Sequence, residues 1–487
     1  MLKIDSCSLQ PLFSVAATRH IEHAAQAALP PHTLMQRAGL AVAQLALAIA
    51  PHARRIWIAC GPGNNGGDGL EAAMHLQRWG KHPVVTWLGS PDSAPQDAAM
   101  SYQRAVAAGV IFAETPPQGC DLFIDALLGM GAANRAPEGR MAHWINLINT
   151  DTSLVLAVDI PTGLQADTGV VTQHCVKAQH TLSLLTLKPG LFTGHGRDAA
   201  GTVWLDELNI ADNRSTDQAL VTPTAWLAGA PMTAARLHAS HKGSFGDVAV
   251  VGGAAGMTGA ALLAAGGALH AGAGRVFVGL LGGGTLSVDS SQPELMFRAL
   301  DGLDFKALTV VCGCGGGDAI RGPLPRILST ASAVVIDADA INTIANDKQL
   351  ETLLRARGER LASSVLTPHP LEAARLLGSS ATQVQAQRLA AAQQLAQRFG
   401  CTVVLKGSGT VIAAPGQTPV INSTGNARLA TAGTGDVLAG MIGAGLAAGL
   451  PAFQAAGEAV YRHGLAAECW SSQKTLTAST LWRSKLT

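Results

Sequence analysis

The 487-residue chain has few charged residues, 14% in all, and a formal net charge of +1 at pH 7. Because it has no long basic run, its charge does not favour a nucleic acid or a membrane surface as partner. Its eight cysteines include no CxxC pair and no Cys/His cluster at zinc-ligand spacing, so we interpret them as reduced core thiols. The sequence begins without the apolar segment of a secretory signal, and later apolar runs are too short for a membrane span. We therefore expect cytoplasmic small-molecule chemistry.

Glycine is abundant, with 55 residues, and hydrophobic residues make up 48% of the chain. This composition is typical of α/β folds, in which tight turns join strands to helices. From Ile56 onward, short apolar runs alternate with helical patterns, which predicts a parallel, doubly wound sheet. The periodicity ends in a polar stretch, and a second set of strands begins at GDVAVVGG. We expect a domain at 1–213, a linker at 214–233 and a second domain at 234–487.

The stretch GPGNNGGDG at 61–69 follows the apolar run IWIAC, and Gly61, Gly63 and Gly66 fit the dinucleotide pattern GxGxxG. An ordinary NAD site also needs an acidic residue about 20 positions later, at the end of the next strand. That strand is VVTWLG and has none, and the turn lacks the lysine of a triphosphate P-loop. The two asparagines and the aspartate between the glycines could simply cap the helix.

Polar side chains follow several strands of the first half. In open α/β sheets the carboxyl ends of the strands meet where ligands bind, so these side chains could share one site. Amide, carboxylate and hydroxyl oxygens suit an alkali or alkaline-earth cation better than zinc. The residues are Asn64, Asn65, Asp68, Asp125, Asp159 and Thr162.

The motifs GPGNNGGDG, DALLGMG and DIPTGL, in this order, resemble the NAD(P)H-hydrate epimerase domain over roughly residues 10–210. The resemblance implies a Rossmann-like fold, potassium held by Asn65, Asp125 and Thr162, and Asp159 as the acid/base that also contacts substrate. Met130 stands where that family usually has a small polar residue. The implied substrate-binding residues are Asn64, Asn65, Gly66, Gly67, Asp68, Gly129, Met130, Gly131, Ala132, Ala133, Asn134, Arg135 and Asp159.

In the second half, AGTGDVLAG at 432–440 opens a helix with small residues followed by Asp436. Backbone N–H groups at such a helix start attract an anion, and the carboxylate suits a base beside an attacking hydroxyl group. A cap is the alternative role for Asp436. CTVVLKGSGTVIAA predicts a hairpin whose tip carries a cation and hydroxyl groups, although KGSGT could be only a polar turn. His369, between prolines, fits a structural role better than catalysis.

The ordered set HKGSFGDVAVVGG, DADAIN, TPHPLEAARLL, KGSGT and AGTGD resembles the NAD(P)H-hydrate dehydratase domain, which is ribokinase-like, from about His241 to Cys469. Arg428 occupies a position where that family usually has a small residue. The resemblance implies two sets of ligand-binding residues. The hydrated nicotinamide would meet Ala260, Gly317, His369 and Asp436, and ADP would meet Lys406, Gly407, Ser408, Gly409, Thr410 and Gly435.

Together the resemblances imply an enzyme that epimerises the R and S hydrates of NADH and NADPH (NADHX and NADPHX) and dehydrates the S form, with ADP as phosphoryl donor and ATP as runner-up. Asp159 and Asp436 are the implied catalytic residues. Magnesium follows from phosphoryl-transfer chemistry. We expect a homo-oligomer without nucleic-acid or membrane partners. Two alternatives remain open: a ribokinase-like small-molecule kinase with an accessory domain, and a non-catalytic binding module in the first half. A kinase would release a stable phosphorylated product.

Overall fold

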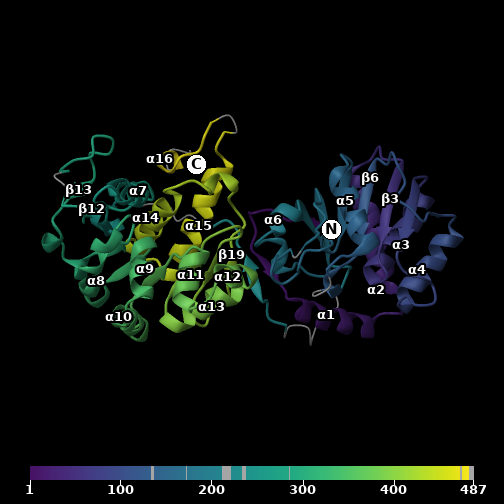
Figure 1. Ribbon diagram of the computed structural model, residues 1–487, viewed down its shortest axis with the longest axis horizontal. Coiled ribbons are helices and arrows are strands. Elements are labelled where there is room, and N and C mark those ends of the chain that lie inside the picture. Colours follow the sequence, from purple (N-terminus) through teal and green to yellow (C-terminus); the bar gives the residue numbers. More distant parts are fainter. Residues whose placement is uncertain are drawn as a thin grey trace. The chain divides into compact units, whose positions relative to one another are not determined.

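The computed structural model describes residues 1–132, 136–171, 173–210, 221–232, 237–283, 286–471 and 474–481. Ala133, Asn134 and Arg135, and residues 214–220 and 233 of the expected linker, lie outside the described residues. The chain divides into two compact units (Figure 1). The first consists of Met1–Asp5 and Gln10–Trp226, and the second of Ser6–Leu9 and Leu227–Thr487.

The first unit contains a sheet with the strand order β1-β9-β8-β7-β6-β3-β4-β5. All neighbouring pairs are parallel except β1 with β9. The chain runs outward from β3 to β4 and β5 and then returns to β6, so the strand order reverses beside β3, as in a doubly wound sheet. The strands of this unit are β1 (Leu2–Lys3), β2 (Gln10–Leu12), β3 (Arg55–Cys60), β4 (His82–Trp87), β5 (Ile111–Phe112), β6 (Leu122–Ala126), β7 (Leu154–Val158), β8 (His180–Leu184) and β9 (Thr202–Asp206).

Side chains of β3 alternate between two cores because successive residues of a strand point to opposite faces. Ile56, Ile58 and Cys60 pack with residues of α2 and α3, whereas Trp57 packs with Trp144 of α5. Both faces are covered, so the strand is a continuous apolar run. In Figure 1, α3 and α5 lie on opposite sides of β3. The helices are α1 (Val15–Ala28), α2 (Thr33–Ile49), α3 (Asn64–Arg78), α4 (Gln96–Ala107), α5 (Gly139–Thr150) and α6 (Gly196–Ala199).

The sheet of the second unit runs β13-β12-β11-β14-β15-β16-β17-β18-β19. Pairs from β13 to β17 are parallel, and β17, β18 and β19 form antiparallel pairs, which confirms the hairpin predicted from CTVVLKGSGTVIAA. The strands are β11 (Asp247–Gly252), β12 (Arg275–Leu280), β13 (Met296–Phe297), β14 (Thr309–Cys312), β15 (Ala333–Ile336), β16 (Ser364–Leu366), β17 (Thr402–Leu405), β18 (Val411–Ala413) and β19 (Val420–Ile421); β10 (Ala225–Leu227) lies at the boundary of the units.

Helices α7 and α14 pack at very close range in the second unit. A Cβ atom added to Gly440 of α14 would lie 1.9 Å from the carbonyl oxygen of Ala264 in α7, and one added to Gly267 would lie 2.4 Å from that of Val437. Glycine is therefore required at both positions, and the backbones of the two helices lie in direct contact there. The helices are α7 (Thr258–His270), α8 (Leu324–Thr330), α9 (Ala338–Ala345), α10 (Lys348–Glu359), α11 (Pro370–Leu377), α12 (Ala381–Ala386), α13 (Arg388–Phe399), α14 (Thr434–Ala447), α15 (Ala452–Glu468) and α16 (Ala478–Leu481).

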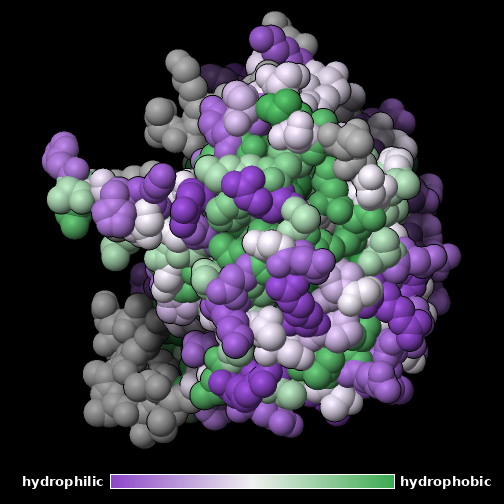
Figure 2. Space-filling view, turned by 90° about the vertical axis from the view of Figure 1, so that its left-hand side faces the viewer, coloured by the Kyte–Doolittle hydropathy of each residue, from purple (hydrophilic) through white to green (hydrophobic). Residues whose placement is uncertain are grey.

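The structure can be compared with what the composition of the sequence predicted. Within the described ranges, no helix has both the length and the apolar character needed to cross a membrane. The face of the second unit in Figure 2 mixes hydrophilic and hydrophobic side chains. All eight cysteines are free thiols, but Cys7 and Cys469 are exposed, so the interpretation of every cysteine as a core thiol is wrong for these two.

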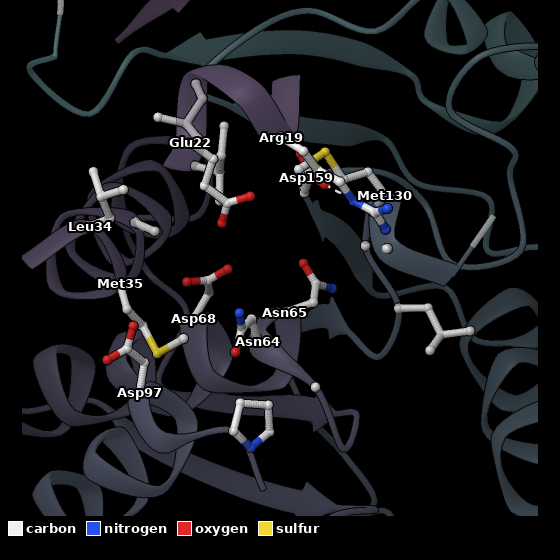
Figure 3. Close-up of a pocket in the computed structure, with 18 of the residues that line it drawn as sticks. Arg19, Glu22, Leu34, Met35, Asn64, Asn65, Asp68, Asp97, Met130 and Asp159 are labelled. Carbon is white, nitrogen blue, oxygen red and sulfur yellow. Dashed lines mark hydrogen bonds between the residues drawn. The ribbon is translucent and has the colours of Figure 1, made fainter. Parts of the chain in front are cut away.

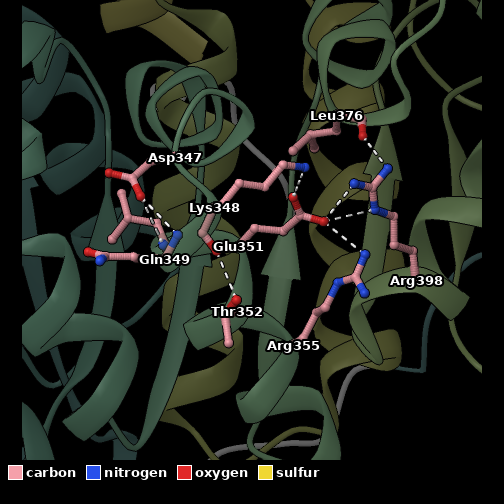
Figure 4. A network of polar contacts seen from close by, with 9 residues as sticks. Asp347, Lys348, Gln349, Glu351, Thr352, Arg355, Leu376 and Arg398 are labelled. Carbon is pink, nitrogen blue, oxygen red and sulfur yellow. Dashed lines mark hydrogen bonds and ion pairs between the residues drawn. The ribbon is translucent and has the colours of Figure 1, made fainter.

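A network of charges joins α10 to α13 in the second unit (Figure 4). The carboxylate of Glu351 accepts hydrogen bonds from Arg398 at 2.6 Å, Arg355 at 2.8 Å and Lys348 at 3.1 Å. Arg398 also donates to the carbonyl oxygen of Leu376, at the end of α11. The hydrogen bond from Arg398, with those from its neighbours, lowers the pKa of Glu351 to about 2. One carboxylate thus connects α10, α11 and α13.

We expect Glu351→Gln to lower the free energy of unfolding at neutral pH by about 1 kcal/mol, since the amide cannot form ion pairs. The folded-state pKa of Glu351 lies below its ordinary value of 4.5, so this stabilisation is complete above pH 4.5 and is lost as the pH falls toward 2. Urea unfolding at several pH values measures it. Glu359→Gln, on an exposed position of the same helix, is the control. An equal difference between wild type and Glu351→Gln at all pH values would contradict the prediction.

Candidate active sites

A cavity of about 960 Å³ opens in the first unit, at the carboxyl ends of β3, β6, β7 and β8. This is the position that the sheet topology favours for a ligand. Figure 3 shows Asn64, Asn65, Asp68 and Asp159 around the same space, so four residues singled out from the sequence come together here. Helix α1, which had no assigned role, supplies one wall. The other predicted residues that line the cavity are Gly129, Met130 and Gly131.

The glycines of GPGNNGGDG allow the backbones of β3, α3 and the loop after β6 to pack closely against one another. A Cβ atom at Gly61 would lie 1.7 Å from the carbonyl oxygen of Leu127, and one at Gly66 would lie 2.0 Å from that of Gly61. Gly67 likewise faces the side chain of Met35, at 2.7 Å. A Cβ atom at Gly63, which lines the cavity, would meet nothing within 4 Å. Close packing therefore explains most of these glycines. The polar side chains that could contact a ligand belong to the residues between them.

Both carboxylate oxygens of Asp159 have a partner in the structure. Its Oδ1 forms an ion pair with Lys188 Nζ at 2.5 Å, and its Oδ2 accepts a hydrogen bond from the backbone N–H of Met130 at 3.0 Å. Lys188 is fully buried and also donates to the carbonyl oxygen of Leu184 and to Ser183 Oγ. Asp159 has a φ of +65°, in the left-handed region that few residues other than glycine adopt. Such strain is common where a side chain must point into a functional site.

Asp125 and Thr162 form a buried pair beside the loop Leu127–Gly129, which lines this cavity. Thr162 donates to the Asp125 carboxylate through its hydroxyl group at 2.7 Å and through its backbone N–H at 2.8 Å. Burial raises the pKa of Asp125 to about 6, while these hydrogen bonds act in the opposite direction. Leu128 N–H donates to Thr162 Oγ1, which links the pair to the loop that ends at Gly129. A Cβ atom at Gly129 would lie 3.0 Å from Asn65 Oδ1, so Asn65 approaches the same loop.

Besides Asp159, the carboxyl groups of Asp68, Glu22 and Asp97 line the cavity. Burial raises the pKa of Asp68 well above its usual range, and the negative charges of Asp159 and Glu22 raise it further. Glu22, on α1, also has a raised pKa, chiefly because of burial and then because of Asp159. The raised values mean that the cavity can hold protons on carboxyl groups close to Asp159.

In the second unit, the predicted residues gather at the carboxyl ends of β14 to β17. Lys406 Nζ, just after β17, forms an ion pair with Asp337 Oδ1 at 2.7 Å, just after β15. Thr367, after β16, donates to the same carboxylate at 2.8 Å. Burial alone would lower the pKa of Lys406, but Asp337 and Glu372 outweigh it, so the pKa is raised and the side chain is a cation. Lys406 therefore lies in the site rather than at an exposed hairpin tip.

Asp436 lies beside this ion pair, in the first turn of α14. The Cys314 sulfur and one carboxylate oxygen each from Asp337 and Asp436 lie within 4.8 Å of one another. Burial and the charge of Asp337 raise the pKa of Asp436 to about 7. A Cβ atom at Gly435 would lie 3.4 Å from Lys406 Nζ, so the ammonium group flanks the helix start. A cation, the amides of a helix N-terminus and a carboxyl group that titrates near neutrality thus meet here.

The loop from Lys406 to Thr410 is shaped by Arg388, which sequence reasoning missed. This buried guanidinium donates to the carbonyl oxygens of Leu405 and Lys406, and its burial lowers its pKa to about 10. Gly407 has a φ of +133°, and a Cβ atom there would lie 2.9 Å from Arg388 Nη1. Thr410 Oγ1 donates within the turn, to the carbonyl oxygen of Gly407. The turn is therefore a fixed one, which the letters KGSGT alone could not establish.

The remaining predicted residues have local roles. His369 caps α11: its Nδ1 accepts from the N–H groups of Leu371 and Glu372, which fits the structural reading of this residue. Gly317 has a φ of +49° and its N–H donates to Asp339. A Cβ atom at Gly315 would lie 2.8 Å from that of Ala260, so Ala260 borders the same loop. Arg428 donates to the carbonyl oxygen of Trp470.

Comparisons with known proteins match both halves of the chain. Residues 31–190 match the family described as YjeF-related protein N-terminus, and residues 248–486 match the NAD(P)H-hydrate dehydratase family. The chain is 35% identical over 461 residues to the Bifunctional NAD(P)H-hydrate repair enzyme Nnr of Escherichia coli (strain K12), an alignment that covers 90% of this chain and 85% of that protein. The chain belongs to the family of bifunctional NAD(P)H-hydrate repair enzymes. The resemblance found in the sequence motifs and the α/β fold class are both confirmed.

Two further similarities concern the second half of this repair-enzyme family member. The ADP-dependent (S)-NAD(P)H-hydrate dehydratase of Neisseria meningitidis serogroup B is 46% identical over 255 residues, which covers 51% of this chain and 84% of that protein. A crystal structure of the ADP/ATP-dependent NAD(P)H-hydrate dehydratase from Bacillus subtilis, co-crystallised with ATP/Mg²⁺, is 31% identical with a TM-score of 0.43 and covers 52% of this chain and 91% of that one.

We expect Asp436→Asn to abolish dehydration and to leave epimerisation intact, because Asp436 belongs to the second unit and does not line the cavity of the first unit. If Asp436 acts as a base, it must be ionised, and a pKa of about 7 means that the wild-type dehydration rate falls as the pH drops below neutrality. Steady-state rates from about pH 5.5 to 8.5 would measure this. Asp318→Asn, which changes another aspartate of the second unit, is the control. Dehydration by Asp436→Asn at the wild-type rate would exclude a catalytic role.

Proposed function

We propose that the chain repairs hydrated NADH and NADPH through two activities. The first unit epimerises the R and S hydrates, and the second dehydrates the S form to NAD(P)H while ADP is converted to AMP and phosphate. The observation that carries the proposal is the place of Asp436 in a kinase-like site of a chain that aligns with a repair enzyme over 90% of its length. Cytoplasmic location and a homo-oligomeric state stay predictions.

Dehydration needs a better leaving group than hydroxide, and phosphorylation supplies one. Asp436 accepts the proton of the ring hydroxyl as that oxygen attacks the terminal phosphoryl group of ADP. The N–H groups that open α14, together with Lys406, stabilise the charge that develops on the phosphoryl oxygens. Loss of phosphate from that carbon, together with loss of a proton from the adjacent ring carbon, then restores the ring double bond. Asp337 keeps Lys406 in place through their ion pair and does not itself touch the substrate in this mechanism.

Magnesium would accompany the nucleotide. The carboxylate of Asp337 offers the hard oxygen ligand that Mg²⁺ prefers, and the phosphates of the nucleotide would supply further oxygen ligands, which leaves Asp436 as the base. Cys314 completes the cluster, but burial raises the pKa of its thiol well above the usual range, so the sulfur stays protonated and is a poor ligand for Mg²⁺. When bound, the ion would supply charge neutralisation at the phosphoryl oxygens.

Potassium would be held in the first unit by Asn65, Asp125 and Thr162. These residues offer amide, carboxylate and hydroxyl oxygens, which are suitable donors for a hard cation. The amide nitrogen of Asn65 is buried and has no hydrogen-bond partner among the described residues, which fits an amide that is oriented by its oxygen. The ion would fix the loop Leu127–Gly129, since that loop already contacts all three residues.

The alternative is a small-molecule kinase with a non-catalytic first unit. The observation against it is the first cavity itself, in which Asn65, Asp68 and Asp159 are all present and in which Asp159 is strained and ion-paired. A binding module that had lost its chemistry would not need to keep a buried lysine on this carboxylate.

The decisive measurement gives the purified chain both NADHX epimers with ADP, magnesium and potassium, and follows the absorbance of reduced nicotinamide. We expect complete recovery, since epimerisation feeds the R form to the dehydratase, with release of one phosphate per NADH formed. Recovery of about half of the reduced nicotinamide would show that epimerase activity is absent, because only the S form would be consumed. A stable phosphorylated product without recovery would instead favour the kinase alternative.

Potassium binding can be tested by thermal unfolding, which needs no assay of enzyme activity. A ligand that binds only the folded state stabilises it by about 1.4 kcal/mol at ten times its Kd. We expect the melting temperature to rise with KCl and not with choline chloride, and Thr162→Val to lose this response. Thr152→Val, at an exposed position of the same unit, is the control and should keep the rise in melting temperature with KCl. A melting temperature of wild type that responds equally to both salts would rule out a specific potassium site.

A further inference from the structure

Helix α1 brings a side chain to the cavity that none of the sequence motifs included. Glu22 lines the cavity from α1, whereas Asp68 belongs to α3 and Asp159 follows β7. In Figure 3 the Glu22 carboxyl group points toward that of Asp68, across the space that Asn65 and Asp159 also border. The substrate cavity thus has a carboxyl group on the wall opposite the loops of the sheet.

Asp159 alone is poorly equipped for a reaction that moves two protons. One of its oxygens is bound to the ammonium group of Lys188 and the other to the N–H of Met130. Because both oxygens already accept hydrogen bonds, Asp159 has no proton to donate, and a second group is needed to donate one. Epimerisation inverts the ring carbon that carries the hydroxyl group, so the donor must reach the ring from another direction.

We propose that Glu22 is a second catalytic residue of the epimerase site, the acid that works opposite the base Asp159. This inference rests on the proposed epimerase function. Asp159 takes the proton of the ring hydroxyl, the bond between that carbon and the ring nitrogen breaks, and its electron pair goes to the nitrogen. Glu22 gives its proton to the nitrogen, which leaves an aldehyde. After rotation of the aldehyde carbon, the nitrogen attacks its other face, and both protons return to the groups that held them.

The charges around Glu22 agree with this role. Burial and Asp159 raise its pKa, whereas His23, Lys188 and Arg19 act in the opposite direction and limit the rise. The largest influences on Asp68, which are burial and the charges of Asp159, Glu22, Asp97 and Glu71, all raise its pKa. We assign the acid to Glu22 because it faces the cavity from α1, on the wall opposite the loop that carries Asp159.

The test compares full-length wild type with Glu22→Gln in the interconversion of R and S NADHX without ADP, after subtraction of the spontaneous rate. Loss of a general acid costs about 100-fold or more in rate. We expect kcat for epimerisation to fall by about that factor with KM nearly unchanged. Because the protonated acid is the active form, the wild-type rate should fall as the pH rises, and Glu22→Gln should weaken that dependence.

Three comparisons keep the inference falsifiable. Glu22→Asp, which retains a carboxyl group, should keep more activity than Glu22→Gln, and His20→Gln, on an exposed position of the same helix outside the cavity, should match wild type. Both Glu22 variants should dehydrate S-NADHX normally. A folded Glu22→Gln with wild-type kcat, or with a change in KM alone, would overturn the role of Glu22. Absence of epimerisation by wild type would instead refute the proposed function.

Discussion

In each unit, an ion pair between a lysine and an aspartate holds two loops that follow different strands, and this pair is buried in the first unit and partly buried in the second. Lys188 with Asp159 and Lys406 with Asp337 cross between loops at the carboxyl edge of a parallel sheet. A buried charge is tolerated only when it is paired and hydrogen-bonded, and both pairs meet this condition, through Leu184 and Ser183 in the first unit and Thr367 in the second. Removing one partner of such a pair costs about 3–5 kcal/mol. The loops are therefore held in one arrangement.

The two pairs produce different chemistry because of what surrounds them. In the first unit, carboxyl groups from α1, α3, α4 and the loop after β7 line one cavity, so their mutual repulsion and burial keep protons on some of them. That environment suits proton exchange with a neutral ring. In the second unit, the lysine flanks the start of α14, and the amides and the ammonium group together attract an anion. That environment suits a phosphoryl group, beside a single carboxyl group with a pKa of about 7.

The sequence was enough to predict the alternation of strands and helices, because apolar runs in parallel sheets are nearly continuous and the turns are marked by glycine. It also located Asp159 and Asp436, which directly follow strand or glycine motifs. It could not reveal Glu22 or Lys188, since a single glutamate on an ordinary helix and a lysine before Pro189 have no local pattern. Arg388 was hidden for the same reason: it lies 17 residues from Leu405, and only the folded chain brings them together. Such partners depend on tertiary contacts, whereas motifs depend on neighbours along the chain.

The pattern GxGxxG of the first unit shows why a motif and its function can separate. Gly61 and Gly66 are required because backbone carbonyl oxygens lie where their side chains would be, and this steric demand arises in any tight turn between a strand and a helix packed on the sheet. The same demand holds whether a dinucleotide serves as a redox cofactor or is itself repaired. What distinguishes the two cases is the set of residues at the cavity: Asn64, Asn65 and Asp68 replace small spacers, and no acidic residue ends β4. The glycines therefore fix the geometry of the turn, and the polar residues between them decide its chemistry.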